Sequence, residues 1–153
     1  MRRDLYLALT EAFVLPYRRG GGWLGHQVIN TVKVEAGRSV AVCECGGVSL
    51  NCIQDATLVG AEPIIAVDIL DNKLEMAAKC GATHRITSSQ EDAVARIQEI
   101  TGGAGAHYAF EAIGLQGETF LQSVLCSRKR GVSVFVGHVP VDTRIALDAR
   151  MLI

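Results

Sequence analysis

The sequence predicts an α/β fold, a single doubly wound parallel sheet of the Rossmann type with helices on both faces. Apolar runs of strand length alternate with stretches of helical periodicity along most of the 153 residues. The connections have the length of βα units, and the consecutive strands of such units run parallel. One stretch, Arg38 to Asp71, reads in order as strand, glycine turn, helix, strand and acid. This order is typical of a βαβ unit.

Within this unit, residues 38–42 (RSVAV) form a short run with alternating valines, as expected of a buried parallel strand. Gly46 and Gly47 follow where the chain must turn sharply. Helical spacing of apolar side chains then runs from Val48 to Val59, and Gly60 can end that helix. A second buried strand, residues 64–67, leads directly into Asp68.

The rest of the chain continues the alternation. We expect a glycine-rich loop at Arg18–Gly25, a helix from Asp71 capped by that residue and closed by Gly81, and a capping box between Ser89 and Asp92. The remaining expected helices are Leu5–Leu15, Gln27–Val34, Glu91–Thr101 and Gln116–Ser127, and the remaining strands are Thr83–Thr87, Ala106–Ile113, Gly131–Gly137 and Thr143–Leu147. We divide the chain into residues 1–25, a helix and glycine-rich loop, and residues 26–153, the α/β domain.

A dinucleotide is the ligand that such a βαβ unit typically binds. The helix N-terminus offers free N–H groups to a pyrophosphate, and an acid about twenty residues later accepts hydrogen bonds from the adenosine ribose. The usual G-x-G-x-x-G positions here hold Glu44, Gly46 and Ser49, so only the middle glycine is present. Glu44 is unfavourable if the turn needs a positive φ, and its charge opposes a pyrophosphate. Both a binding unit and one that has lost its nucleotide remain open.

Composition restricts the other function classes. The net charge is −1 with interspersed signs, which argues against a nucleic-acid partner, and the apolar runs are too short to span a membrane. Five cysteines, without a C-x-x-C pair, favour free thiols in a reduced, cytoplasmic protein. Neither the cysteines nor the four histidines have metal-ligand spacing, so we predict no metal site in this chain.

Five segments carry a family resemblance, and they are residues 28–37, 40–54, 64–84, 99–114 and 134–140. In these segments the chain resembles the coenzyme-binding domain of zinc-containing medium-chain alcohol dehydrogenases. Within that family it is most similar to the glutathione- or mycothiol-dependent formaldehyde dehydrogenase branch. The resemblance implies NAD as cofactor, with hydride transfer between NAD and an alcohol, an aldehyde or a formaldehyde–thiol adduct.

The resemblance also implies roles for individual residues. Asp68 would hold the adenosine ribose and favour NAD over NADP, with Lys73 reaching the same sugar. The other implied contacts are Gly46, Gly47 and Val48 at the pyrophosphate turn and nicotinamide, Ile113 near the adenosine, and Val136 and His138 beside the carboxamide.

Two departures from the family shape the functional prediction. The family binds a catalytic zinc in a separate domain whose ligands are not found here, and Arg19 stands where a zinc cysteine is expected. Residues 1–25 would be the remnant of that domain, so we assign no catalytic residue and expect the isolated chain to be inactive. The family's sixth strand would follow Ile153, which leaves open that the sheet lacks this edge strand.

The expected partners are therefore a second copy of the chain or a chain that carries the catalytic domain. The alternative function is a non-catalytic, degenerate Rossmann domain that serves as a dimerisation or interaction module.

Overall fold

A computed structural model of the chain describes residues 28–29, 32–113 and 117–136. The strands are β1 (Val40–Cys43), β2 (Ile64–Asp68), β3 (His84–Thr87), β4 (Ala106–Glu111) and β5 (Ser127–Phe135). The helices are α1 (Gly47–Leu58), α2 (Asp71–Cys80), α3 (Ala93–Ile100) and α4 (Gly117–Cys126). The expected helix Leu5–Leu15, the glycine-rich loop and the strand Thr143–Leu147 lie outside the described residues.

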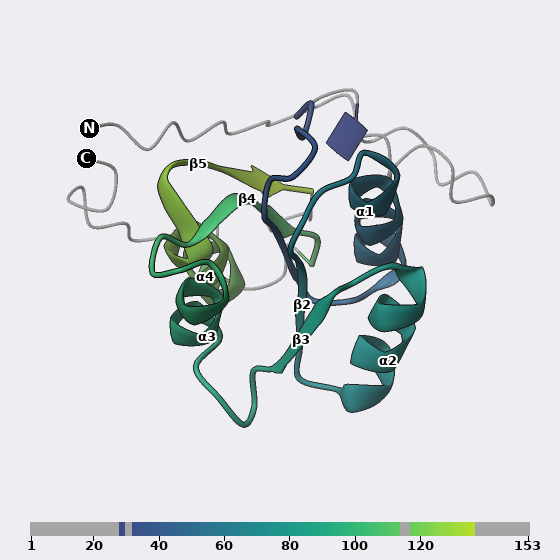
Figure 1. Cartoon of the computed structure of the whole chain (residues 1–153). Helices are drawn as coiled ribbons and strands as arrows, with labels where there is room; N and C mark the ends of the chain where they lie inside the picture. The colour runs from purple at the N-terminus through teal and green to yellow at the C-terminus, as the bar shows by residue number, and fades with distance from the viewer. Residues whose placement is uncertain (1–27, 30–31, 114–116, 137–153) are drawn as a thin grey trace.

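All five described strands form one parallel sheet in the order β3-β2-β1-β4-β5 (Figure 1). The order reverses between β1 and β4, because the chain leaves β3 at one edge and returns beside β1. In an open α/β sheet, ligands bind at such a switch point, outside the carboxyl ends of the strands. The predicted doubly wound fold is confirmed, and its topology points to the carboxyl ends of β1 and β4.

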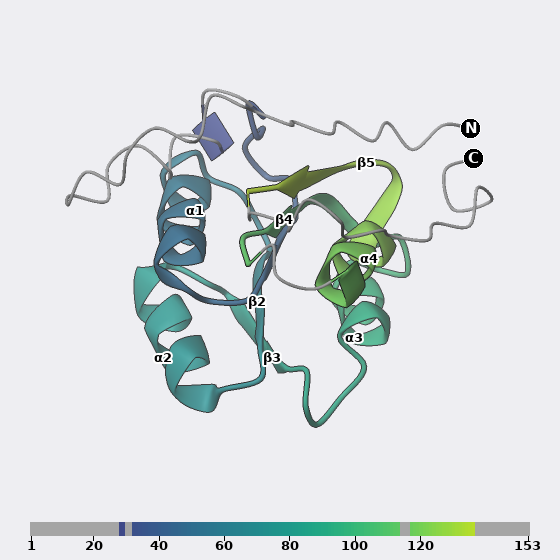
Figure 2. The ribbon, with the colours of Figure 1, turned by 180° about the vertical axis from the view of Figure 1, so that it is seen from behind.

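Two helices cover each face of the sheet. Figures 1 and 2 show α1 and α2 on one face and α3 and α4 on the other. Side chains of alternate strand residues enter the two cores: Val40 and Val42 pack with α1 and α2, whereas Ala41 packs with α3. The central strands β1 and β2 are buried along their whole length, which is why they read as continuous apolar runs in the sequence.

Two predicted caps differ in detail. The N-cap of α3 is Asp92, whose carboxylate accepts from the N–H groups of Val94 and Ala95, so the expected capping box with Ser89 is wrong. Asp71 does not cap α2 but is its first residue, and it accepts a hydrogen bond from the Thr87 hydroxyl at 2.9 Å. A carboxylate there still lies in the first turn, where the helix dipole favours negative charge.

Two element boundaries were also wrong. Residues 32–35 are not helical, so the expected helix Gln27–Val34 does not continue through its second half; Lys33 takes φ 53° and the Val34 N–H bonds to the Val28 carbonyl. Strand β5 begins at Ser127, four residues before the expected start at Gly131. The β4–β5 register shows why: Ala106 pairs with Ser127 but Tyr108 pairs with Val132, so the residues between bulge out of the ladder.

Glycine is required after α2 for two separate reasons. Gly81 ends the helix with φ 118°, a left-handed conformation that side chains rarely adopt. A Cβ added at Gly81 would also lie 2.0 Å from the Thr57 hydroxyl oxygen of α1. Gly81 therefore allows α1 and α2 to approach each other on the same face of the sheet.

We expect Gly81→Ala to destabilise the chain more than Gly102→Ala, its matched control. Gly102 also has a positive φ, 67°, but a Cβ there meets no atom within 4 Å. The control should lower the free energy of unfolding by about 1 kcal/mol, from backbone strain alone. Gly81→Ala should cost about 1–3 kcal/mol more because of overpacking against Thr57. Equal losses in urea denaturation would contradict the close approach of the two helices.

Candidate functional site

The predicted cofactor contacts that the structure describes converge at the carboxyl ends of the strands, which we call the carboxyl edge of the sheet; the opposite ends form the amino edge. Cys43 pairs with Val67 and with Glu111, and Glu111 pairs with Phe135, so the carboxyl ends of β1, β2, β4 and β5 are level. The turn at Gly46–Val48 follows β1, Asp68 ends β2, Ile113 follows β4 and Val136 follows β5. Segments far apart in the sequence thus meet at the switch point.

Asp68 links three segments at this edge. Its carboxylate accepts a hydrogen bond from the Cys45 N–H at 2.8 Å and another from the Leu70 N–H at 2.9 Å. The Asp68 side chain is 0% exposed, whereas Lys73, whose ammonium nitrogen lies 3.5 Å from the same carboxylate, is 38% exposed. Asp68 therefore ties the turn after β1 to the end of β2, and its ion pair reaches solvent through Lys73.

Glu44 occupies a backbone position suited to glycine. Its φ is 66°, and its N–H donates to the Val67 carbonyl at 2.7 Å, which holds the turn against β2. The prediction that a side chain at this position conflicts with the turn is confirmed by this left-handed conformation. The first residue of the glycine pattern is thus replaced without loss of the turn, at a cost in backbone strain.

The charge of Glu44 is disfavoured as well as its backbone. Partial burial raises the pKa of its carboxyl, and the negative charges of Asp68 and Glu111 raise it further, although Lys73 opposes them. Each of these carboxylates belongs to the end of β1, β2 or β4. The end of the sheet that would receive a phosphate therefore gathers three carboxyl groups, which Lys73 opposes.

The turn itself leaves room for a ligand. Gly46 and Gly47 are exposed, and a Cβ added at either one meets nothing within 4 Å. Gly46 is the N-cap of α1, and because glycine has no side chain it makes no side-chain hydrogen bond to the N–H groups of the first turn. Free N–H groups at a helix N-terminus, under a backbone without side chains, fit a phosphate group. Ser49 is buried beneath the turn, where it preserves close packing of the helix on the sheet.

The remaining predicted contacts lie beside this turn. Ile113 and Val136 are half-buried, and both are held by Glu111: its carboxylate accepts from the Ile113 N–H at 2.9 Å, and its main-chain oxygen accepts from the Val136 N–H at 2.7 Å. The sequence analysis did not identify Glu111, because no local pattern shows that its carboxylate and carbonyl hold two other segments. His138 lies outside the described residues.

The cysteines next to the turn are poor metal ligands. Cys45 is buried and its thiol donates to the Val67 carbonyl, and burial raises its pKa to about 12. A hydrogen bond with Cys126 raises the pKa of the buried Cys43 thiol. Across residues 28–29, 32–113 and 117–136, no group of three or more His, Cys, Asp or Glu residues could hold a metal ion. The helices in these ranges are each too short or too polar to cross a membrane.

Comparison with known proteins shows which family the chain is similar to. The sequence profile of the zinc-binding dehydrogenase family matches residues 47–153. The chain is 35% identical over 126 residues to S-(hydroxymethyl)glutathione dehydrogenase of Paracoccus denitrificans, covering 78% of this chain and 33% of that protein. The chain spans about a third of the length of the curated relatives it matches.

Two solved structures share the fold. Benzyl alcohol dehydrogenase of Acinetobacter calcoaceticus matches with a TM-score of 0.79 and 35% identity, covering 83% of this chain and 34% of that one. A zinc-binding dehydrogenase of Sinorhizobium meliloti, solved bound to NADP, matches with a TM-score of 0.78 and 25% identity, covering 84% and 38% of the two chains.

The strain at Glu44 leads to a test with a built-in control. Glu44→Ala removes the carboxylate but keeps a Cβ at positive φ, whereas Glu44→Gly removes both. We expect the glycine variant to exceed the alanine variant in free energy of unfolding by about 1 kcal/mol. Chemical denaturation of the two variants at one pH measures this difference, and equal stabilities would show that the turn is unstrained.

The raised pKa of Glu44 predicts a pH dependence. The folded chain keeps this proton at pH values where the unfolded chain, with a pKa near 4.5, has released it. The free energy of unfolding should therefore fall as pH rises through the range between the unfolded and folded pKa values, and level off above it. Glu44→Gln, which cannot titrate, should lack this fall. Parallel stability curves for the two proteins would contradict the assignment.

Proposed function

This chain belongs to the zinc-binding dehydrogenase family, and from that premise we propose that it binds NAD(H) across the carboxyl edge of its sheet. The single observation that carries the proposal is the open glycine turn at the uncapped N-terminus of α1, directly beside Asp68. A pyrophosphate would lie on Gly46 and Gly47, with Val48 against the nicotinamide. The alternative of a purely structural interaction module has no comparable support in the comparisons.

Asp68 supports NAD in preference to NADP. A carboxylate at the end of β2 accepts hydrogen bonds from ribose hydroxyls and repels a 2′-phosphate. The Asp68 side chain is fully buried, and Lys73, its ion-pair partner, is partly exposed. The ribose would therefore reach Asp68 from the side of Lys73. The NADP in the Sinorhizobium meliloti structure belongs to that protein, so cofactor preference is a point for experiment here.

The other cofactor contacts would be made by apolar side chains. Ile113 would pack near the adenosine and Val136 beside the nicotinamide carboxamide, which His138, two residues later, would also contact. Glu111 would act as a positioning residue, because it holds the backbone of both Ile113 and Val136. These residues bind and orient the cofactor, and none is assigned a proton-transfer step.

The reaction we propose is hydride transfer within an alcohol-dehydrogenase-like oxidoreductase. When bound, the nicotinamide supplies the hydride acceptor or donor, and zinc in this family polarises the substrate oxygen. Residues 26–153 would form the nucleotide-binding domain, and the zinc ligands would come from a catalytic domain in the same assembly. The proposed partners are a second copy of the chain and a chain that carries the catalytic domain, and the second of these would complete the enzyme.

A formaldehyde–thiol adduct is the substrate suggested by the chain's own resembling segments. The similarity to the Paracoccus denitrificans enzyme supports this choice. The equal identity to a benzyl alcohol dehydrogenase makes a simple alcohol the competing candidate. The substrate contacts are expected in the catalytic domain, so a substrate assay requires the complete enzyme.

We expect the chain to bind NADH saturably and to bind NADPH at least about tenfold more weakly. A tenfold difference in affinity corresponds to about 1.4 kcal/mol of binding free energy. Asp68→Asn should lose this preference because the amide no longer repels the 2′-phosphate. Asp71→Asn, which alters the neighbouring carboxylate at the start of α2, should keep it. Titrating each protein with NADH and with NADPH, and following the cofactor fluorescence, gives the two dissociation constants for the natural chain and both variants.

Glu44→Gly serves as a second variant in this experiment. It removes a carboxylate from the acidic edge and should tighten NADH binding, most strongly at high pH where Glu44 is ionised. The proposal fails if neither the natural chain nor Glu44→Gly binds NADH while both remain folded by circular dichroism.

A further inference from the structure

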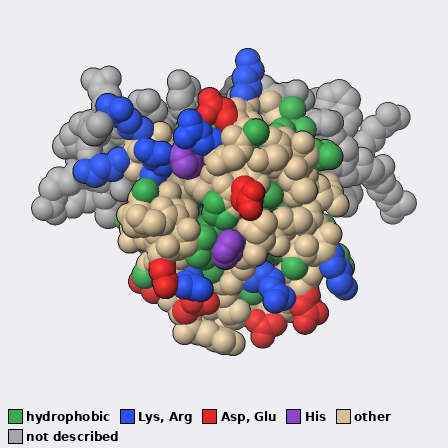
Figure 3. All heavy atoms as spheres, in the orientation of Figure 1, with side chains coloured by type: hydrophobic (Ala, Val, Ile, Leu, Met, Phe, Trp, Pro, Cys, Tyr) green, Lys and Arg blue, Asp and Glu red, His purple; other side chains and the backbone are tan. Residues whose placement is uncertain are grey.

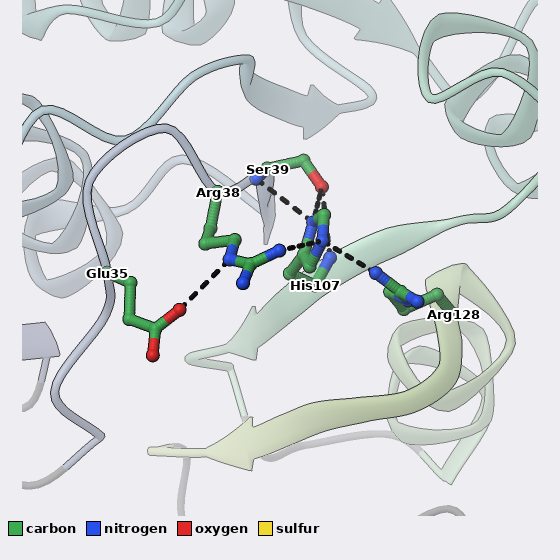
Figure 4. Close-up of polar contacts among 5 residues, drawn as sticks. All are labelled: Glu35, Arg38, Ser39, His107 and Arg128. Atoms are coloured by element: carbon green, nitrogen blue, oxygen red, sulfur yellow. Dashed lines mark hydrogen bonds and ion pairs between the residues drawn. The ribbon is translucent and has the colours of Figure 1, made fainter.

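The amino edge of the sheet carries a basic cluster that the nucleotide site does not use. It comprises Arg38 and Ser39 before β1, His107 on β4 and Arg128 on β5, with Glu35 at its rim (Figure 4). Because all described strands are parallel, this edge lies opposite the glycine turn. Figure 3 shows several Lys and Arg side chains gathered beside a histidine at the upper left of the molecule.

Two guanidinium groups point at one nitrogen of His107. Arg128 Nη1 lies 2.7 Å from Nε2, and Arg38 Nη1 lies 3.3 Å from it. Guanidinium nitrogens only donate, so Nε2 must be unprotonated and accept. The other nitrogen, Nδ1, lies 2.7 Å from the Ser39 hydroxyl oxygen, which fixes the ring plane. Burial, with the charges of Arg128 and Arg38, lowers the pKa of His107 and keeps the ring neutral.

The bulge in β5 brings more positive charge to the same place. Residues 128–131 leave the ladder between the Ala106–Ser127 and Tyr108–Val132 pairs, and Arg130 takes φ 64° within it. A Cβ on Gly131 would lie 2.9 Å from the Arg128 carbonyl oxygen, so the bulge closes tightly on itself. Lys129 and Arg130 are exposed. The bulge therefore presents three consecutive cationic side chains.

Few acids balance this charge. Glu35 pairs with Arg38 at 3.0 Å. Within the described ranges, Arg128, Lys129 and Arg130 make no ion pair. Arg38 thus has an acidic partner, whereas Arg128 donates to a neutral imidazole and pairs with no acid of the described residues. An anion at this edge would supply a counter-ion.

A pocket adjoins the cluster on the side of Arg128. It has a volume of about 380 Å³ and is lined by Gln98, Gly103, Ala104, Ser127, Arg128 and Lys129. The turn of residues 102–105 before β4 lies directly against the start of β5, because a Cβ on Gly105 would be 2.9 Å from the Arg128 backbone nitrogen. The pocket is large enough for a small anion, and two of its lining residues, Arg128 and Lys129, are cationic.

We propose that this amino-edge pocket binds a phosphate group, held by Arg128 and Lys129 with Arg38 nearby. A guanidinium donates two parallel hydrogen bonds to a phosphate, and the ammonium adds a point charge. A phosphate dianion matches the unpaired positive charge better than a single carboxylate does. The group could be free phosphate or the phosphoryl end of a larger molecule, and the experiment separates the two.

The test follows the ring C–H resonances of His107 by NMR, assigned with His107→Asn, at constant ionic strength maintained with sodium chloride. Inorganic phosphate should shift them saturably and should raise the pKa of His107, because the anion offsets the field of the two arginines. A phosphomonoester, AMP, is titrated in parallel. Tighter binding of AMP assigns the site to a phosphorylated molecule, and tighter binding of phosphate assigns it to the free ion.

Arg128→Gln should weaken phosphate binding about tenfold or more, as expected for the loss of a charge-assisted pair. Lys129→Gln, an exposed position, should weaken it less and covers the case in which Arg128→Gln does not fold. Arg85→Gln, an exposed arginine on β3, is the matched control and should leave the affinity unchanged.

Saturating NADH should not alter the phosphate affinity, because the two sites lie at opposite edges of the sheet. A variant that cannot bind NADH should bind phosphate with the same affinity as the natural chain. That result would show that the phosphate site does not depend on the nucleotide site. The proposal is overturned if chloride alone reproduces the shift, if Arg85→Gln weakens binding as much as Arg128→Gln, or if NADH displaces phosphate.

Discussion

The hydrogen bonds from Cys45 and Leu70 to the buried carboxylate of Asp68 hold the functional edge of this fold together. They connect the turn after β1 to the end of β2, beside the hydrogen bond from the Glu44 N–H to the Val67 carbonyl. A buried carboxylate is costly unless its oxygens are paired, and here the backbone and Lys73 supply the partners. These hydrogen bonds hold the turn before α1 beside the end of β2.

The two edges of the parallel sheet have opposite electrostatic characters. The carboxyl edge gathers Glu44, Asp68 and Glu111, and partial burial, together with the charges of the other two, raises the pKa of Glu44. The amino edge gathers Arg38, Arg128 and a neutral His107. A net charge of −1 conceals this separation. Such an arrangement follows from parallel topology, because residues before the strands and residues after them can never meet on the same edge.

Most of the fold was accessible from pattern alone. The helix after the glycine turn, expected at Val48–Val59 and found at Gly47–Leu58, and the strand that leads into Asp68 were predicted because apolar spacing and glycine placement have local causes. The segment before Gly37 was not, since Val28 and Val34 are buried by tertiary packing and not by a helical stripe. The start of β5 was also missed, because only the partner strand β4 shows that Ser127 belongs to the ladder and that Arg128–Gly131 bulge from it.

By itself, the sequence determined the order of strands and helices, the position of the glycine turn and the acid that follows it, because these depend on side-chain periodicity and local backbone preference. Only the tertiary structure decided that Glu44 would adopt a left-handed conformation, that Asp68 would be buried, and that Glu111 would hold the backbone of Ile113 and Val136. The same holds for the meeting of Arg38, His107 and Arg128. These features arise from contacts between segments distant in the chain, and such contacts leave no periodic signal in any one of them.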